Sequence, residues 1–477
     1  MLRVYNTLTR EKEEFKPLEP GKASIYCCGV TPYNDPHIGN ARPFVTWDVV
    51  RRYLEKKGYA VRYVQNFTDI DDKIIRRAKE AGETWKELAD HYIAEYFKAI
   101  DALNVRRADA YPRVSEHIAD VLAVIEKLIE KGYAYALDGD VYYSVERFAG
   151  YGKLSGRSLD DMQAGARVGV DERKHHPMDF ALWKAAKPGE PSWDSPWGKG
   201  RPGWHIECSV MSTMKYLGET FDFHGGGSDL IFPHHENEIA QAQACTGDDH
   251  SFARYWLHNG FITIHDEKMS KSKNNFFTVK DILEKYAGEV VRFFIVQTHY
   301  RSPLDFTDER LAEAKTSLAR LKNSWDNAAE LSSRKDESSG SAKSLLAAAM
   351  EAKAAFYEAM DDDFNTALAI SHLFSLSKEI NIYYNEVTTG AAAFDAANFA
   401  KVRAVYAEMA EVIGIFEAKE EKADDGLVDS LMELLLNLRQ KAREEKNWAL
   451  ADHLRDELKA RGVVIEDTPQ GARWKRA

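Results

Sequence analysis

Side chains that suit a metal ion occur at several places along this chain. Cys28 ends an apolar segment, Cys208 lies far along the chain, and His234 and Glu238 share one face of a helix-like run because they are four residues apart. Thiolate, imidazole and carboxylate groups are all ligands of zinc. Core packing would equally explain the cysteines, and a charged helix surface would explain the HHENE run. The residue types therefore raise a zinc site as one hypothesis.

Two other strings are suited to binding phosphate groups. His37-Ile38-Gly39-Asn40 follows a predicted strand and precedes a predicted helix, where free N–H groups and the helix dipole favour an anion. Lys268 and Lys271 are three residues apart in the string KMSKS and can surround a pyrophosphate. Alone, the first string is equally typical of a turn and the second of a solvated loop. Their occurrence together, in this order, favours a nucleotide site.

The elements that must position these residues read as a parallel α/β sheet. Segment 23–30 is short and apolar, segment 43–57 has helical spacing, and segment 59–65 alternates and is rich in β-formers. Strand, helix and strand within about 45 residues predict a βαβ unit, which binds ligands beyond the carboxyl ends of its strands. Because adjacent strand residues point to opposite faces, only one of Cys27 and Cys28 should reach the site.

The rest of the chain contains further patterns. We expect a hairpin near 133–145, and an ordered loop at 188–204 whose three tryptophans need burial partners. Segment 221–240 reads as a loop leading into a helix, and the period becomes helical after residue 304. The acidic residues Asp69, Asp71 and Asp72 read as the start of a helix, where they complement the dipole, in preference to a metal cluster.

Composition limits the class of protein. With 64 Lys and Arg against 76 Asp and Glu among 477 residues, the net charge is −12, which excludes a basic coat over the whole surface but not a local basic patch. Four cysteines are too few for a disulfide scaffold and fit a reducing compartment. No signal peptide or apolar membrane span is visible, so we expect a cytoplasmic protein without a membrane partner.

The two phosphate strings together resemble the paired signatures of class I aminoacyl-tRNA synthetases. The segments YCCGVTPYNDPHIGN, NFTDIDDKI, GRPGWHIECS, FDFHGGGSDLIFPHHENEIAQ and EKMSKSKNN resemble the cysteinyl-tRNA synthetase family, and their spacing fits it over nearly the whole chain. One position departs from the pattern, because Asn40 stands where the first signature usually ends in a second histidine. Asparagine can form a hydrogen bond but carries no charge.

The resemblance implies a set of site residues. One zinc ion per chain would be held by Cys28, Cys208, His234 and Glu238, with Cys27 and His235 as bystanders and Cys245 structural. ATP, accompanied by Mg²⁺, would be bound by His37, Asn40, His224, Gly225, Gly226, Gly227, Asp229, Lys268 and Lys271, of which His37, Asn40, Lys268 and Lys271 would be catalytic. Gly29, Thr68, Trp204 and His205 would contact the amino acid.

The activity implied by the resemblance is ATP-dependent formation of cysteinyl-adenylate from L-cysteine, followed by transfer to the 3′ end of tRNA(Cys). Zinc would distinguish the cysteine thiolate from the hydroxyl of serine, so we expect no editing site. Two rival activities stay open, namely a cysteine ligase acting on an amino sugar and a catalytically inactive zinc-dependent RNA-binding protein. The long C-terminal extension argues against the first, and the intact KMSKS string argues against the second.

The resemblance also predicts how the chain is divided. Segment 360–368 resembles a helix start in a bundle, with its acidic run as the cap. In the tail, cations for phosphates and an aromatic ring for stacking would be Arg439, Arg443, Arg455, Arg473 and Trp474. We expect a monomer with a doubly wound Rossmann-type catalytic domain at 1–265 carrying a connective insertion at about 110–200, a signature loop and stem-contact region at 266–320, an all-α helical bundle at 321–418 and a small anticodon-recognition domain at 427–477.

Overall fold

The computed structural model describes residues 1–164, 173–264, 267–268, 277–334, 341–417, 425–461, 463–468 and 471–476. The chain divides into two compact units, residues 1–416 and 417–477. Within the described ranges, no helix combines the length and the apolar character that crossing a membrane requires.

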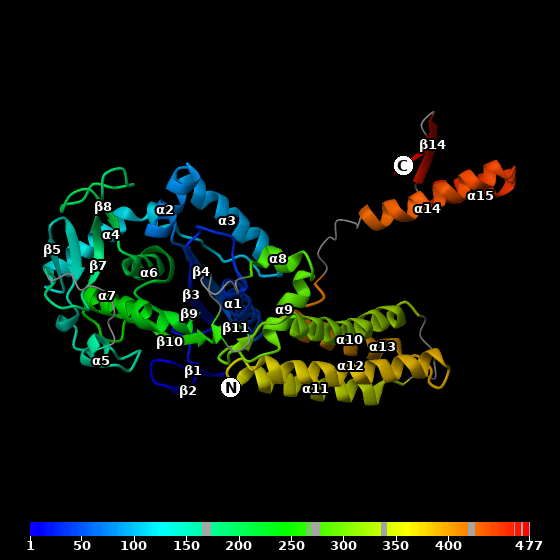
Figure 1. The fold of residues 1–477 in the computed structure, drawn as a ribbon. Coiled ribbons are helices and arrows are strands. Elements are labelled where there is room, and N and C mark those ends of the chain that lie inside the picture. The colour runs from blue at the N-terminus through cyan, green and yellow to red at the C-terminus, as the bar shows by residue number, and fades with distance from the viewer. Residues whose placement is uncertain are drawn as a thin grey trace. The chain divides into compact units, whose positions relative to one another are not determined.

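A four-stranded parallel sheet forms the centre of the first unit (Figure 1). Its strands lie in the order β10 (Phe252–Asn259), β9 (Thr220–Gly227), β3 (Lys22–Val30) and β4 (Ala60–Phe67). Strand β3 pairs with β4 on one side and with β9 on the other, so the strand order reverses between β3 and β9. Ligands bind at such a switch point in doubly wound sheets. The predicted α/β class is confirmed, and β3 and β4 are the strands predicted at 23–30 and 59–65.

The helix that joins these strands, α1 (Ile38–Lys56), begins five residues before the predicted start at 43. The Nδ1 atom of His37 accepts a hydrogen bond from the Asn40 N–H, and Asn40 Oδ1 accepts one from the His37 N–H, both at 3.2 Å. This capping box satisfies free N–H groups of the first turn. It sets the start of α1, and Pro43 consequently lies inside the helix instead of at its first position.

Strand β9 extends to residue 227, where the sequence predicted a loop, so that prediction is wrong for residues 221–227. Gly225, Gly226 and Gly227 are typical loop residues. Here Gly225 and Gly226 make room for rings packed on the strand, since a Cβ on Gly225 would lie 2.4 Å from the Trp47 ring and one on Gly226 would lie 2.7 Å from the His235 ring. The glycines thus permit close packing without ending the strand.

The insertion between β4 and β9 has its own antiparallel sheet. The predicted hairpin is confirmed, and it turns at Asp138 and Gly139, whose φ angles of 51° and 90° are left-handed. Of the loop tryptophans, Trp193 and Trp197 pack against other tryptophan rings, whereas Trp204 is 42% exposed. The elements are α2 (Asp72–Ala81), α3 (Trp85–Ala102), α4 (Ile118–Glu130), β5 (Ala134–Leu137), β6 (Asp140–Tyr143), α5 (Leu159–Ala164), β7 (Phe180–Ala185), β8 (Gly200–Pro202) and α6 (Trp204–Ser212).

Smaller elements complete the catalytic region. Helix α7 (Glu236–Thr246) connects β9 to β10, and β1 (Arg3–Asn6) pairs with β2 (Glu11–Glu14). Strand β11 (Ile262–Ile264) pairs with β12 (Glu267–Lys268) and β13 (Leu304–Asp305). Helices α8 (Val279–Leu283) and α9 (Gly288–Val296) lead toward the bundle.

The bundle consists of α10 (Asp308–Ser332), α11 (Lys343–Asp361), α12 (Thr366–Thr388) and α13 (Ala396–Ile413). Helix α10 is continuous across the predicted boundary at 320/321, so the two predicted regions share a helix. The acidic run does not cap a helix start: Asp361 ends α11, and Asn365 caps α12 by accepting the Leu368 N–H. Asp363 instead accepts hydrogen bonds from the Tyr5 N–H and the Tyr300 hydroxyl, both at 2.8 Å.

A buried cluster of charges ties the bundle to the sheet domain. Asp48 Oδ2 accepts from Arg52 Nε at 2.7 Å and from Arg292 at 2.6 Å. Arg292 Nε also donates to the Ile413 carbonyl at 2.7 Å, and Arg52 donates to the Glu411 carbonyl at 3.1 Å. Since helices α1, α9 and α13 all contribute, the cluster holds the end of the bundle against α1.

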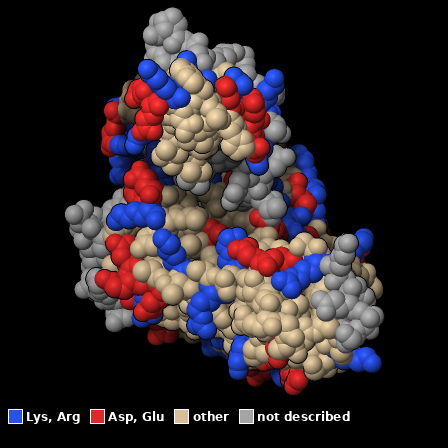
Figure 2. All heavy atoms as spheres, turned by 90° about the vertical axis from the view of Figure 1, so that its right-hand side faces the viewer, with Lys and Arg blue, Asp and Glu red and all other residues tan. Residues whose placement is uncertain are grey.

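The second unit contains α14 (Asp425–Glu444), α15 (Trp448–Ala460) and an antiparallel hairpin of β14 (Val463–Thr468) and β15 (Gly471–Arg476). Arg455 forms ion pairs at 3.0 Å with Asp452 and Asp456, and Trp474 lies opposite Ile465 in the hairpin. The side chain of Arg473 lies outside the described residues. On the face shown in Figure 2, Lys and Arg are intermingled with Asp and Glu, so this face has no uniform basic coat.

Candidate metal and nucleotide site

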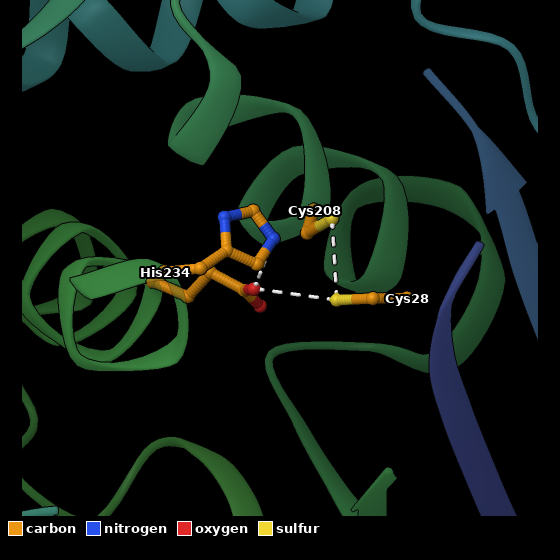
Figure 3. Close-up of side chains that lie close together, drawn as sticks. Cys28, Cys208 and His234 are labelled. Carbon is orange, nitrogen blue, oxygen red and sulfur yellow. Dashed lines mark hydrogen bonds and ion pairs between the residues drawn. The ribbon is translucent and has the colours of Figure 1, made fainter. Parts of the chain in front are cut away.

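Four side chains from distant parts of the chain meet at the switch point of the sheet. Cys28 comes from the end of β3, Cys208 from α6, His234 from the turn before α7 and Glu238 from α7, and all are buried. Figure 3 shows Cys28, Cys208 and His234 pointing toward one another. Cys28 Sγ lies 3.6 Å from Cys208 Sγ and 3.5 Å from Glu238 Oε1, and His234 Nε2 lies 2.9 Å from that oxygen.

These separations fit a tetrahedral metal ion. Zinc–sulfur bonds of 2.3 Å place two sulfur ligands about 3.8 Å apart, close to the separation of the two cysteines, which are free thiols. Two thiols, an imidazole and a carboxylate form a donor set that favours zinc over harder cations. The four residues therefore match zinc in both geometry and chemistry.

The cluster also stabilises charge. Burial raises the pKa of Cys208, but hydrogen bonding from Cys28 and the nearby His234 outweigh burial and lower this pKa to about 6. Burial opposes the imidazolium of His234, yet Glu238 and Cys208 raise its pKa to about 10. Burial likewise opposes ionisation of Glu238, while His224 and His234 hold its pKa well below the usual range. The neighbouring groups thus favour the ionised forms of Cys208 and Glu238, which are the forms that bind a cation.

Neighbouring residues orient the cluster, and the sequence analysis did not assign them this role. His224 Nε2 lies 2.7 Å from Glu238 Oε2. His235 Nε2 lies 3.3 Å from Cys28 Sγ, and its Nδ1 lies 2.8 Å from His258 Nε2. Partners beyond the direct ligands fix the ring orientation in metal sites. In the sequence, the only sign of these contacts is the presence of three further histidines, His224, His235 and His258. Their spacing does not indicate which side chains they contact.

Cys27 lies on the other face of β3. It packs in the hydrophobic cluster that contains α1 and the bundle, whereas Cys28 belongs to the cluster that contains α6 and α7. The alternation expected for a strand therefore sends the two adjacent thiols to opposite faces. Of the two, only Cys28 belongs to the candidate ligand cluster with Cys208.

A pocket of about 360 Å³ opens beside the cluster. Cys28 and Gly29 line one part of it, and His37, Gly39 and Asn40 at the start of α1 line another. The helix dipole places partial positive charge at this end of α1, whereas the N–H groups of Ile38 and Asn40 already donate to Phe277 O and His37 Nδ1. The pocket therefore joins a thiol-rich cluster to an anion-binding helix end.

The predicted nucleotide residues differ in their placement. Gly226, Gly227 and Asp229 line the pocket, together with His37 and Asn40. His224 and Gly225 do not: His224 is fully buried and stacks on Trp256, and Gly225 faces the Trp47 ring. Only the backbone of Lys268 is described, in β12, and Lys271 lies outside the described residues.

The predicted amino-acid residues surround His234 and the end of β3. Trp204 lines the pocket and stacks on the His234 ring, with centroids 4.3 Å apart, while His205 Nδ1 lies 2.9 Å from His234 Nδ1. Gly29 lines the pocket and donates its N–H to Asn66 Oδ1 at 2.9 Å. Thr68 does not line the pocket, and its hydroxyl donates to Glu207 at 2.8 Å.

Solved structures share this fold. The chain resembles the Mycobacterium tuberculosis methionyl-tRNA synthetase in complex with methionyl-adenylate, with a TM-score of 0.59 and 15% identity over 82% of this chain and 89% of that one. It also resembles the LeuRS of Agrobacterium radiobacter K84 in a complex with tRNA, with a TM-score of 0.59 and 11% identity over 84% and 85% of the two chains. At these identities the likeness concerns the fold alone.

Family models identify the chain more closely. The model of the tRNA synthetases class I (C) catalytic domain matches residues 14–316, a DALR domain matches 355–417, and the Cysteinyl-tRNA ligase anticodon binding domain matches 428–474. The sheet, its switch point and the first match define a class I aminoacyl-tRNA synthetase.

Curated relatives complete the assignment. The Cysteine--tRNA ligase of Heliobacterium modesticaldum is 57% identical over 100% of both chains, and that of Thermococcus onnurineus is 53% identical over 100% of this chain and 99% of its own. The chain belongs to the cysteinyl-tRNA ligase family.

Proposed function

We propose that this protein activates L-cysteine with ATP to form cysteinyl-adenylate and then transfers the cysteinyl group to the 3′ end of tRNA(Cys). The observation that carries the proposal is the pocket in which Cys28 of the ligand cluster and His37 and Asn40 of the α1 start line the same space. A thiol substrate and the phosphates of ATP can therefore meet there. The match to an anticodon binding domain at 428–474 favours tRNA over an amino sugar as acceptor.

Cys28, Cys208, His234 and Glu238 hold zinc in this proposal. Bound zinc would supply a Lewis acid that favours the thiolate of cysteine over the hydroxyl of serine, which resists ionisation. The chain's own residues orient this site: His224 holds the second oxygen of Glu238, and the Trp204 ring covers one face of His234. Discrimination then depends on metal chemistry, and the pocket need not separate two side chains of similar shape.

The remaining pocket residues act on ATP. His37 and Asn40 contact the triphosphate at the start of α1, Gly226 and Gly227 admit the adenine ring, and Asp229 accepts hydrogen bonds from the ribose hydroxyls. Lys268 and Lys271 stabilise the departing pyrophosphate, which Mg²⁺ accompanies. The protein mainly positions the cysteine carboxylate for attack on the α-phosphorus.

The proposed function is tested by ATP–pyrophosphate exchange with each amino acid, followed by acylation of tRNA(Cys) and of an amino sugar. We expect exchange with cysteine alone, loss of exchange after zinc is removed, and acylation of tRNA. Acylation of the sugar only would assign the amino-sugar ligase. Absence of cysteine-dependent exchange would leave an inactive RNA-binding protein.

Lys271→Ala is expected to lower kcat for exchange by about 100-fold or more, because the lysine charge stabilises the transition state for pyrophosphate release. The KM for cysteine should change little, since binding of the amino acid does not use this charge. Steady-state exchange kinetics measure both constants. The control Lys273→Ala lies two residues away and should retain near-normal kcat, and an equal loss in the two variants would contradict the assigned role.

His224→Asn is expected to weaken zinc binding by about 10- to 100-fold, because residues that orient a metal ligand typically contribute this much. Its imidazole lies 2.7 Å from Glu238 Oε2, and asparagine is too short to replace that contact. Competition between the protein and a zinc-chelating dye measures the affinity. Cys245→Ala serves as the control because this thiol lies outside the candidate ligand cluster. Unchanged affinity in His224→Asn would exclude an orienting role.

A further inference from the structure

Helix α2 carries a row of cations that begins at the rim of the pocket. Lys73 lines the pocket, and Arg76 and Arg77 follow it by three and four residues, so the three side chains share one side of the helix. All three are exposed. We call this surface the α2 basic face. Among the described residues that line the pocket, Lys73 is the only lysine or arginine.

The helix that bears this face is firmly held. Asp71 caps it by accepting the Lys73 N–H at 2.7 Å, which confirms the predicted helix start. Asp72 forms ion pairs with Arg201 and, at 3.0 Å, with Lys184 of the insertion. The opposite side of α2 buries Ile74 and Ala78 in a cluster with Leu88 of α3. The helix that carries the cations is therefore held in place beside the pocket.

The charges of the α2 basic face are available to a partner. Within the described part of the chain, Arg76 contacts no acidic side chain. Arg77 has an ion pair with Glu80 at 3.7 Å, in which both side chains are about half exposed, and such pairs contribute little. Asp71 and Asp72 are already engaged with the helix start and the insertion. These cations can consequently form favourable electrostatic interactions with the phosphate groups of a bound polyanion.

Aromatic rings lie beside the first of these cations. Tyr33 and Tyr92 line the same pocket, and Lys73 Nζ lies 5.5 Å from the centre of the Tyr33 ring. Cations that follow a backbone, combined with rings on which bases stack, are typical of surfaces for single-stranded nucleic acid. An acidic peptide would satisfy the cations but would offer no bases to the rings.

We infer that the α2 basic face guides the single-stranded 3′ end of the tRNA across the rim and into the pocket. This inference rests on the proposed function, because acylation requires the terminal ribose of the tRNA to reach the pocket. Arg76 and Arg77 bind phosphates of the single strand, and Lys73 binds the phosphate nearest the pocket. Arg76 and Arg77 do not line the pocket, and their contacts with phosphates are not needed to form cysteinyl-adenylate.

The test uses the full-length protein with Arg76→Glu and Arg77→Glu combined. The matched control, Lys16→Glu with Lys22→Glu, makes the same charge change near the amino end of β3, at the sheet edge remote from the pocket. We expect kcat/KM for a tRNA(Cys) transcript to fall by about 10- to 100-fold in the first variant only. The slope of log affinity against log salt should decrease by about 2, one for each lost phosphate contact. Cysteine-dependent pyrophosphate exchange should stay within about twofold.

A truncated transcript identifies the part of the RNA that is bound. A tRNA(Cys) lacking its single-stranded 3′ end should bind the unaltered protein and the first variant equally well. Equal acylation by both proteins, an equal loss in the control, or a preserved preference with truncated tRNA would overturn the inference. If the first variant also loses exchange activity, the uncharged variant Arg76→Gln with Arg77→Gln is measured. Loss of exchange in this second variant would assign the arginines to folding or to activation of cysteine. Absence of exchange in the unaltered protein would instead refute the proposed function.

Discussion

Cys208→Ala is expected to release the bound zinc and to lower kcat/KM for cysteine-dependent pyrophosphate exchange by at least about 1,000-fold. Loss of a residue that only orients a ligand costs about 10- to 100-fold, so loss of a direct ligand should cost more. The Cys208 thiol lies 3.6 Å from that of Cys28, and within the described chain neither Cys27 nor Cys245 belongs to the candidate ligand cluster. Metal content by elemental analysis and exchange kinetics measure the two effects.

The control for this prediction is Cys27→Ala, which removes an equally buried thiol from the opposite face of β3. It should retain zinc and the preference for cysteine over serine. A Cys208→Ala protein that kept both would refute the zinc site. A loss of the same size in Cys27→Ala would show that the effect came from disturbed packing.

Gly29→Ala is expected to destabilise the first unit by about 3 kcal/mol or more and to abolish exchange activity. A Cβ at this position would lie 1.6 Å from the Asn66 carbonyl oxygen, a backbone atom of β4 that cannot rotate away. Relief requires β3 and β4 to separate beside Cys28. Thermal unfolding followed by circular dichroism, together with exchange kinetics, measures the outcome.

Gly58→Ala provides the comparison for Gly29→Ala. Its Cβ would meet open space, although its φ of +93° is left-handed, so we expect a cost of about 1 to 2 kcal/mol and near-normal activity. If Gly29→Ala were as stable and active as Gly58→Ala, close approach of the two strands would not explain the glycine.

The sequence predicted those features that depend on local pattern. Segment 23–30 was recognised as a strand from its run of apolar residues, and the period of a strand separates Cys27 from Cys28. The sequence also predicted the four candidate ligands, through resemblance to a family. The predicted start of α1 is five residues late because the cap uses the side chains of His37 and Asn40, whereas the spacing of apolar residues indicated only the helix from residue 43 onward.

Contacts between distant residues were not predictable in the same way. His258 Nδ1 lies 2.8 Å from Thr7 Oγ1, although the two residues are far apart in the sequence. The Thr68 hydroxyl likewise donates to Glu207, from which much of the insertion separates it in the sequence. The side chain of His224 turns toward Glu238 only because α7 folds back over β9. Such pairs depend on the packing of complete elements, which residue spacing does not encode. The glycines of β9 were wrongly taken to indicate a loop for a related reason. The rings that require Gly225 and Gly226 come from α1 and from the turn before α7, which are distant in the sequence.

The charge cluster of Asp48, Arg52 and Arg292 has a consequence for how this molecule can be dissected. A fragment ending at residue 316, where the match to the catalytic family model stops, would lack the Glu411 and Ile413 carbonyls that receive these guanidinium groups. The guanidinium groups of Arg52 and Arg292 would then lose these hydrogen-bond acceptors, and the core beside them would be partly exposed to solvent. The shortest fragment that keeps the hydrophobic core intact is accordingly longer than the segment that matches the catalytic family model, and it extends to the end of α13.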